Sequence, residues 1–344
     1  MIIKAKGAIL KNQKNDLLID NFYFPNKLTF GQVLIKIAYS GICGSQIGEI
    51  DGVKGIDKFL PHLLGHEGSG VVIDVGDGVT NLKKNDHVVL HWKKNTRIES
   101  QNPNYLWKNK KLNAGKITTF NEYAIISENR ITKINKNFNL KLASLFGCAL
   151  TTGFGAVTNT AKVKLGQSIG IFGCGGVGIS SVIAASLSGC NPIYTFDISD
   201  KKLSFSKKFG ANKTINLKKN KKLNLILNLN LDIIIECTGI KENIEMAFKM
   251  LNDKGVLVLV GVMDHNKSMS INPLPLHFGK KIIGTHGGDG NPEIDIPRYI
   301  DLILSKKINL KALITDEYKL NQINKAIKKI KNNQCLGRTI ISMS

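Results

Sequence analysis

The chain has 344 residues, of which 42% are hydrophobic and 22% are charged, so it is long enough for two domains with substantial cores. Its mean hydropathy is −0.04, and no apolar run approaches the roughly 18 residues that a membrane span needs. The first ten residues lack the pattern of a secretory signal. We therefore expect a cytoplasmic protein that neither spans nor binds a membrane.

The formal net charge of +22 raises the question of an acidic partner such as nucleic acid. Only four of the 48 basic residues are arginines, the side chain that reads bases and phosphates with a fixed bidentate geometry. The lysines are scattered along the chain, which favours a solvated basic surface, and we expect no nucleic-acid partner. Six cysteines without a CxxC spacing make a disulfide framework improbable in a reducing compartment.

The first 150 residues are rich in predicted strands, with apolar segments at 31–42, 68–76 and 86–92 separated by glycines and turns. This pattern predicts a compact antiparallel or barrel-like domain. Residues 93–117 are polar and irregular, and we expect them to form a long surface excursion. The C-terminal part from residue 297 contains two predicted helices and a final strand, and we expect it to rejoin the first domain.

Residues 168–284 show a different pattern, in which predicted strands and helices alternate. Short apolar strands are expected at 168–173, 191–197, 214–216, 231–237 and 255–261, and helices at 179–189, 199–210 and 242–251. Alternating strands and helices of this kind predict a doubly wound parallel sheet with both faces covered, so the fold class of this part is α/β.

A glycine-rich turn follows the first of these strands and opens a helix. The segment GCGGVG matches the dinucleotide-binding pattern, with glycines for the tight turn, for close approach of a pyrophosphate and for helix packing. Asp197 closes the next strand, where a carboxylate binds the adenosine ribose and repels a 2′-phosphate, so we expect NAD rather than NADP. The alternative for this acid is a helix N-terminal residue. The predicted cofactor-binding residues are Gly173, Gly175, Gly176, Val177, Gly178 and Asp197.

A second group of residues carries the ligand types that zinc prefers. Cys43 lies in GICGS, His66 and Glu67 lie in GHEGSG, and Cys148 lies in GCALTTGFGA. Two cysteines and a histidine with an open fourth position are typical of catalytic zinc. By residue type alone, each cysteine is more often a buried apolar residue than a ligand, and His66 is compatible with a turn histidine whose hydrogen bonds are satisfied.

In this order, GICGS, GHEGSGVVIDVGDGVTNLKKNDHVV, GCALTTGFGA and GCGGVG resemble the zinc-dependent alcohol dehydrogenase family of medium-chain dehydrogenases. The resemblance covers essentially the whole chain and includes GTHGG at 284–288 and GRTIIS at 337–342. It implies a GroES-like β-rich catalytic domain, 1–149 with 287–344, split around a Rossmann domain of 150–286. It also implies a small alcohol or aldehyde substrate and a homo-oligomer, either a dimer or a tetramer.

The resemblance further assigns roles to individual residues. It implies one catalytic zinc held by Cys43, His66 and Cys148, with Glu67 as a nearby carboxylate or alternate ligand. Ser45 matches the hydroxyl residue that contacts the substrate oxygen, and Lys202 a position that contacts the adenosine ribose. Arg338 matches a position near the pyrophosphate.

The sequence departs from the family pattern at three places. Residues 93–117 contain no cysteine, so we expect none of the structural zinc that many relatives bind there. Gln46 stands where an acid usually follows the first zinc cysteine, and Gly48 where a histidine often completes a proton relay.

The function expected from the sequence is hydride transfer between an alcohol and NAD, assisted by zinc. The polar segment 93–117 suggests a hydroxyl-rich substrate such as a sugar or polyol derivative. A zinc-free reductase of the same fold and a basic nucleic-acid-binding protein are the alternatives.

Overall fold

The computed structural model describes residues 4–53, 55–219, 223–264 and 266–344. The chain forms two compact units, the first of residues 1–148 and 291–344 and the second of residues 149–290.

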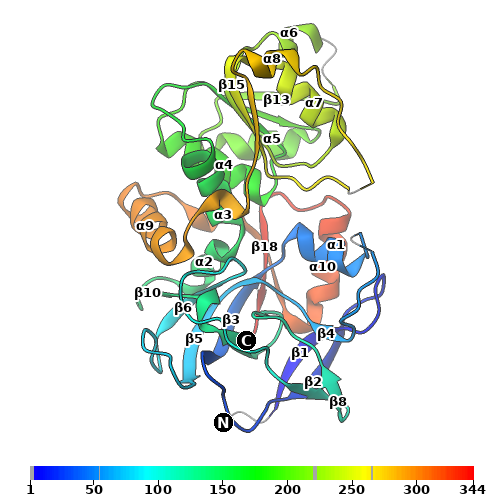
Figure 1. The fold of residues 1–344 in the computed structure, drawn as a ribbon, viewed down its shortest axis with the longest axis vertical. Coiled ribbons are helices and arrows are strands. Elements are labelled where there is room, and N and C mark those ends of the chain that lie inside the picture. The colour runs from blue at the N-terminus through cyan, green and yellow to red at the C-terminus, as the bar shows by residue number, and fades with distance from the viewer. Residues whose placement is uncertain (1–3, 54, 220–222, 265) are drawn as a thin grey trace. The chain divides into compact units, whose positions relative to one another are not determined.

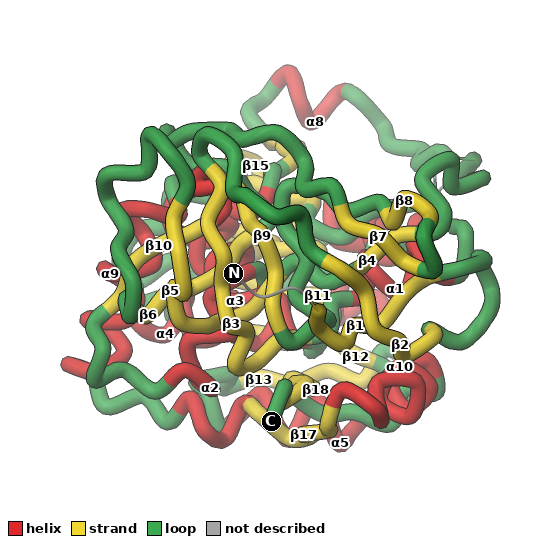
Figure 2. The backbone as a smooth tube through the Cα atoms, turned by 90° about the horizontal axis from the view of Figure 1, so that it is seen from below, coloured by secondary structure: helices red, strands yellow, loops and turns green. Residues whose placement is uncertain are grey.

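The first unit is built mainly from two sheets, which are antiparallel apart from the parallel pair β17–β18 (Figure 1). One has the strand order β4-β1-β2-β7-β8, and the other the order β10-β6-β5-β3-β18-β17 with β9 paired to the first half of β3 (Figure 2). The C-terminal strand β18 pairs with the end of β3, so the last residues of the chain complete the sheet that leads to Cys43. The strands are β1 (Lys4–Leu10), β2 (Leu18–Tyr23), β3 (Gln32–Gly41), β4 (His62–Leu63), β5 (Glu67–Val75), β6 (His87–His91), β7 (Tyr105–Trp107), β8 (Lys110–Leu112), β9 (Tyr123–Ser127), β10 (Ile131–Ile134), β17 (Ile314–Lys319) and β18 (Arg338–Ser342). The helices are α1 (Gly44–Ile50), α2 (Leu140–Ala143), α9 (Pro292–Ser305) and α10 (Ile323–Lys331), with short 3₁₀ turns that include Ser144–Gly147.

The β4-β1-β2-β7-β8 sheet closes on itself. A parallel bridge joins His62 to Asn113, directly after β8, with backbone hydrogen bonds of 3.0 Å from Leu63 N to Asn113 O and from Asn113 N to Pro61 O. The closure lays the segment before the His66 turn alongside the segment after β8. This arrangement makes the domain barrel-like, as the sequence predicts.

The expectation that residues 93–117 form an irregular surface excursion is wrong for the middle of the segment. Residues 105–112 form the β7–β8 hairpin, and Tyr105 is fully buried, with its ring 4.9 Å from that of Phe22 and 5.0 Å from that of Phe24. Its hydroxyl accepts a hydrogen bond from Ile125 N at 2.6 Å. Strands of three residues are too short to show an alternating pattern, and the neighbours of Tyr105 are polar. The sequence pattern therefore did not predict that Tyr105 is buried.

The second unit is a six-stranded parallel sheet in the order β13-β12-β11-β14-β15-β16. This is the 3-2-1-4-5-6 order of a Rossmann fold, which confirms the predicted doubly wound sheet. Phe172 and Phe196 stack within its core at a centroid distance of 4.5 Å. The strands are β11 (Ile169–Phe172), β12 (Ile193–Asp197), β13 (Lys213–Asn216), β14 (Leu231–Glu236), β15 (Leu251–Leu259) and β16 (Lys281–Gly284). The helices are α3 (Ala149–Gly155), α4 (Gly176–Leu187), α5 (Asp200–Lys207), α6 (Leu223–Leu227), α7 (Lys241–Lys249) and α8 (Leu274–His277), with a π-helical turn at Ala156–Thr160 and a 3₁₀ turn at Gly287–Asp289.

No single helix in the described part of the chain is long and apolar enough to cross a membrane. One bent pair of short helices, 140–147 with 149–160, meets the criterion by length and composition, as core helices also do.

Candidate functional site

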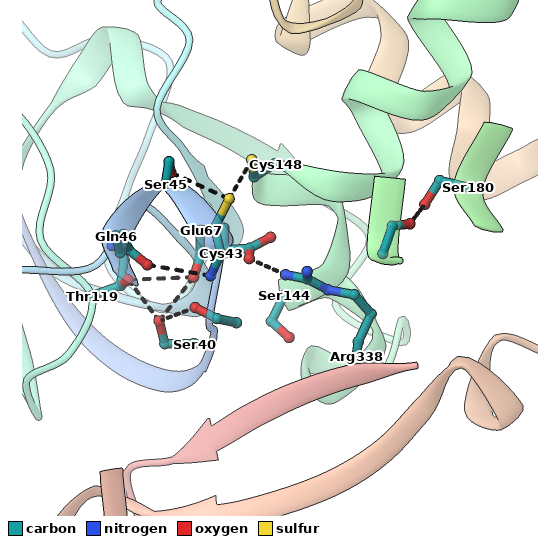
Figure 3. A network of polar contacts seen from close by, with 12 residues as sticks. Ser40, Cys43, Ser45, Gln46, Glu67, Thr119, Ser144, Cys148, Ser180 and Arg338 are labelled. Atoms are coloured by element: carbon teal, nitrogen blue, oxygen red, sulfur yellow. Dashed lines mark hydrogen bonds and ion pairs between the residues drawn. The ribbon is translucent and has the colours of Figure 1, made fainter. Parts of the chain in front are cut away.

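Cys43 lies between the end of β3 and the first turn of α1, in an extended backbone conformation at the helix N-cap. The thiol is half-buried, and the Ser45 hydroxyl donates a hydrogen bond to its sulfur at 3.3 Å (Figure 3). Sulfur at the positive end of a helix is favoured as thiolate, the form that binds metal.

His66 is presented by a tight turn between β4 and β5. Gly65 has φ +98°, and a Cβ there would lie 2.4 Å from the Thr119 hydroxyl and 2.6 Å from the backbone nitrogen of Phe120. Glycine is therefore required for the 119–120 segment to bond the Leu64 carbonyl at 3.0 Å. The turn fixes the direction of the imidazole.

Cys148 reaches the same point from a different part of the chain. It follows the 3₁₀ turn Ser144–Gly147, and a Cβ at Gly147 would lie 2.3 Å from the Leu90 carbonyl oxygen and 2.6 Å from the Glu67 Cα. The absence of a side chain at residue 147 lets Cys148 approach β5 closely. Its sulfur lies 3.9 Å from the sulfur of Cys43 (Figure 3).

Cys43, His66 and Cys148 fit a zinc ion. Their ligand atoms all lie within 4.8 Å of one another. Two thiolates bound to tetrahedral zinc at about 2.3 Å lie roughly 3.8 Å apart, which agrees with the observed 3.9 Å. The Nε2 atom of His66 is buried and has no hydrogen-bond partner in the described part of the chain, and a metal would satisfy it.

The electrostatics also favour a cation at this point. The hydrogen bond from the Cys148 thiol holds the pKa of Cys43 well below its usual value, and the same contact with burial raises the pKa of Cys148. Burial alone would lower the pKa of His66, but the Cys43 thiolate and Glu67 outweigh it and raise that pKa. The two thiols and the imidazole thus share protons within one small cluster. A divalent metal binds such a cluster by displacing these protons.

Glu67 forms a buried ion pair with Arg338 of β18, whose guanidinium donates from Nη2 to Oε1 (Figure 3). Glu67 is fully buried and Arg338 is 7% exposed. A Cβ at Gly41 would lie 2.7 Å from Oε1 and 3.0 Å from Nη2, so the glycine that ends β3 leaves room for the pair. The structure thus brings Glu67 and Arg338 together, a contact that the separate roles predicted for them did not include.

Gln46 supports the His66 turn through the backbone. With the amide oriented so that its oxygen faces the turn, the assignment that satisfies its neighbours, the side-chain carbonyl accepts hydrogen bonds from Gly65 N at 2.7 Å and His66 N at 3.0 Å. The usual acid would reach the imidazole, whereas this amide holds the peptide that carries it. Gln46 is 2% exposed, so it supports the His66 turn from the interior of the domain.

Ser45 and Gly48 lie on α1, close to Cys43. Ser45 is exposed, and its hydroxyl retains acceptor capacity while it donates to the Cys43 sulfur. A Cβ at Gly48 would have Val53 as its nearest neighbour, at 3.8 Å, so a larger side chain has room there.

The glycine-rich turn of the second unit has the form that a dinucleotide pyrophosphate requires. Gly173 has φ +87°, and a Cβ at Gly178 would lie 1.8 Å from the Gly173 carbonyl oxygen, so only glycine permits the packing of α4 on β11. No atom lies within 4 Å of a Cβ built at Gly175, at the N-cap of α4. Open space at a helix N-terminus suits an anion, and Gly176 and Val177 form the first turn.

Asp197 ends β12 beside this turn. Its two carboxylate oxygens accept hydrogen bonds from Cys174 N at 2.8 Å and Ser199 N at 2.9 Å. Each oxygen keeps a further lone pair, so a fixed carboxylate remains able to accept the two ribose hydroxyls. Lys202 lies in the first turn of α5, five residues further on.

A cavity of about 450 Å³ with a mixed lining adjoins His66 in the first unit. It is formed where the closed sheet brings residues 59–66 beside residues 111–117. Apolar side chains line part of it, namely Phe59, Leu63, Leu64, Ala114 and Ile117, and charged, histidine and amide side chains line the rest, among them Glu49, His62, Asn102, Lys111 and Asn113. The sequence alone does not identify these residues, because their proximity depends on the closure of the sheet.

Comparison with known proteins agrees with both units. Residues 29–136 match the family described as alcohol dehydrogenase GroES-like domain, and residues 176–305 match zinc-binding dehydrogenase. Alcohol dehydrogenase 6 of Peromyscus maniculatus is 32% identical over 97% of each chain, and alcohol dehydrogenase class-P of Arabidopsis thaliana is 29% identical over 99% of this chain and 98% of its own.

Two solved structures are similar over nearly the whole length. An alcohol dehydrogenase zinc-binding domain protein from Burkholderia ambifaria has a TM-score of 0.92 at 26% identity and covers 99% of both chains. Benzyl alcohol dehydrogenase from Acinetobacter calcoaceticus has a TM-score of 0.89 at 25% identity and covers 100% of both.

The fold and the cysteine–histidine cluster define a two-domain dehydrogenase of the medium-chain type. Within that class, the chain belongs to the zinc-type alcohol dehydrogenase family. The family predicted from the sequence motifs is therefore confirmed.

Proposed function

We propose that this chain transfers a hydride between an alcohol and NAD at a zinc site formed by Cys43, His66 and Cys148. The observation that carries the proposal is the convergence of these three ligand atoms within 4.8 Å, from three distant segments. When bound, zinc supplies a Lewis acid that makes an alcohol oxygen more acidic, and NAD supplies the hydride acceptor.

The chain's own residues provide positioning and proton transfer. Ser45 is exposed on α1 beside Cys43. Its hydroxyl accepts a hydrogen bond from the substrate hydroxyl and is the first acceptor of the substrate's proton. Glu67 balances Arg338 next to His66, and Gln46 holds the His66 backbone. Gly48 supplies no acceptor, so the proton would pass from the Ser45 hydroxyl to solvent water.

The cofactor part of the proposal rests on the second unit. Gly173, Gly175 and Gly178 support pyrophosphate binding at the start of α4, and Asp197 supports selection of NAD by repelling a 2′-phosphate. Lys202 and Arg338 are the proposed contacts to the adenosine ribose and the pyrophosphate.

The substrate class that the cavity beside His66 supports is a hydroxyl-rich alcohol, such as a sugar or polyol derivative. Its amide and charged side chains offer hydrogen bonds that a purely apolar alcohol leaves unmade. A zinc-free reductase of the same fold is disfavoured, because that reaction has no use for a complete ligand set.

We also propose that the chain forms a homo-oligomer, either a dimer or a tetramer, and that it is cytoplasmic. Strand β16 is an edge of the six-stranded sheet, and Leu274 and Phe278 beside it are 56% and 70% exposed, which supports a subunit contact there. All six cysteines are free thiols, as suits a reducing compartment. Light scattering of the purified protein tests the assembly.

The activity is tested by incubating the purified, zinc-loaded protein with NAD and a panel of primary, secondary and polyhydroxylated alcohols, and following NADH absorbance. The proposal expects NADH formation that is lost with Cys43→Ala. Turnover that survives in the Cys43→Ala protein freed of zinc refutes it.

A further inference from the structure

Two cavities adjoin each other in the first unit. The cavity beside His66 shares Asn102 and Lys111 with a second cavity of about 510 Å³. Because these two residues line both cavities, a ligand that extends from His66 past Lys111 would enter the second cavity. Both cavities have volumes within the range of small-molecule sites.

Positive charge is concentrated in the second cavity. Among the described residues that line it, the charged ones are three lysines, Lys27, Lys111 and Lys116. The first cavity holds an acid, Glu49, together with His62 and the shared Lys111. An anionic group is therefore favoured in the second cavity over the first.

The side chains at the junction are available to a ligand. Within the described part of the chain, no hydrogen bond or ion pair engages the side chains of Lys27, Asn102 or Lys111. The Lys116 ammonium donates to the Ser100 carbonyl, which holds its charge in place and leaves two further donors. Converging lysine donors without acidic partners form a site for an anion.

We propose that the substrate is a polyol or sugar alcohol that bears an anionic group, either a phosphate monoester or a carboxylate, and that Lys27, Lys111 and Lys116 bind this group while the reacting hydroxyl lies at the metal site. The proposal rests on the proposed alcohol dehydrogenase function and extends it to the far end of the substrate. Asn102 and Asn113 contact the intervening hydroxyls. Glu49 disfavours the reverse orientation, because its carboxylate would repel an anion placed in the first cavity.

The test compares matched substrates on the zinc-loaded enzyme with NAD. Ribitol and sorbitol are measured against ribitol 5-phosphate and sorbitol 6-phosphate, and gluconate provides the carboxylate arm. We expect kcat/KM for one anionic series to exceed that of the neutral polyols by about 10- to 100-fold, the factor that one charge-assisted hydrogen bond supplies. The phosphate and carboxylate arms decide which anion the site accepts.

Lys111→Gln should reduce the anionic-to-neutral ratio of kcat/KM by about ten-fold or more. Lys110→Gln is the matched control, since Lys110 is the exposed neighbour in β8 and lines neither cavity. It should leave the ratio unchanged. The preference should also weaken as ionic strength rises.

A direct binding measurement separates this inference from the proposed function. Calorimetric titration of the zinc-loaded protein with ribitol 5-phosphate should show binding that weakens in Lys111→Gln, whether or not turnover occurs. Turnover of neutral alcohols with no preference for either anionic series overturns the inference and leaves the proposed function intact. Failure of both ribitol 5-phosphate and gluconate to bind also overturns it.

Discussion

Arg338 and Glu67, 271 positions apart in the sequence, form a buried ion pair directly beside the histidine of the metal cluster. Arg338 begins β18 and Glu67 begins β5, and both strands flank β3. The pair thereby couples the C-terminal strand to the metal site. Its two charges depend on each other, because both side chains are buried.

Arg338→Met should destabilise the protein by about 3–5 kcal/mol, since it leaves the Glu67 charge buried without a partner. Urea unfolding of the zinc-loaded protein measures the effect. Arg97→Met is the control, because the Arg97–Glu293 pair is partly exposed and should cost under about 1 kcal/mol. The double variant Arg338→Met/Glu67→Gln should recover part of the loss. A loss in the double variant equal to the sum of the single losses would show that the two residues act independently.

One zinc per chain is expected from elemental analysis, because the described part of the chain offers one cysteine–histidine cluster and residues 93–117 contain no cysteine. Cys43→Ala or Cys148→Ala should abolish zinc binding and turnover. NADH binding, followed by its fluorescence, should persist, because the glycine-rich turn lies in the other unit. Two tightly bound zinc ions in the wild-type chain would contradict this prediction.

Asp197→Ser should shift cofactor preference toward NADP. The wild-type carboxylate is fixed by two backbone hydrogen bonds and repels a 2′-phosphate, whereas serine removes the repulsion. We expect the NAD-to-NADP ratio of kcat/KM to fall by about ten-fold or more. Asp200→Ser, at an exposed acid in the next helix turn, serves as the control. A wild-type enzyme that already prefers NADP would refute the role of Asp197.

Ser45→Ala should reduce alcohol oxidation at neutral pH by at least about 100-fold, the lower figure for positioned proton transfer. Ser45→Thr should retain most of the activity because it keeps the hydroxyl. Zinc content should be unchanged in both, since Ser45 contacts the Cys43 sulfur through a hydrogen bond only. A Ser45→Ala rate within about two-fold of wild type, far below that range, would show that the serine merely shapes the turn.

Gly48→His tests whether proton transfer limits the rate. A side chain has room at this position, where the nearest neighbour of a Cβ is Val53 at 3.8 Å. If the proton leaves slowly, the histidine should raise kcat between pH 6 and 7. Gly48→Gln, of similar size without a titrating group, is the control. An equal effect of both variants would assign the change to packing.

The parts of the molecule that the sequence predicted are those encoded locally. Gly173, Gly175 and Gly178 share one turn, and Asp197 ends the next strand, so spacing alone identified them. The proposed zinc ligands were assigned through family motifs, since their separations in sequence carry no geometric information. The anchoring of Tyr105 and the pairing of Arg338 with Glu67 escaped prediction, because each depends on strands that meet only in the folded sheet.

The cavity beside His66 owes its shape to the bridge between His62 and Asn113, which is made by main-chain atoms. Such hydrogen bonds do not depend on which side chains the two segments carry. The walls can therefore exchange residues in the course of evolution without moving apart, while the turn that presents His66 stays fixed by Gly65. Divergence in substrate range among proteins with this closure should accumulate at 111–117 and 59–62, and should leave the metal ligands unaltered.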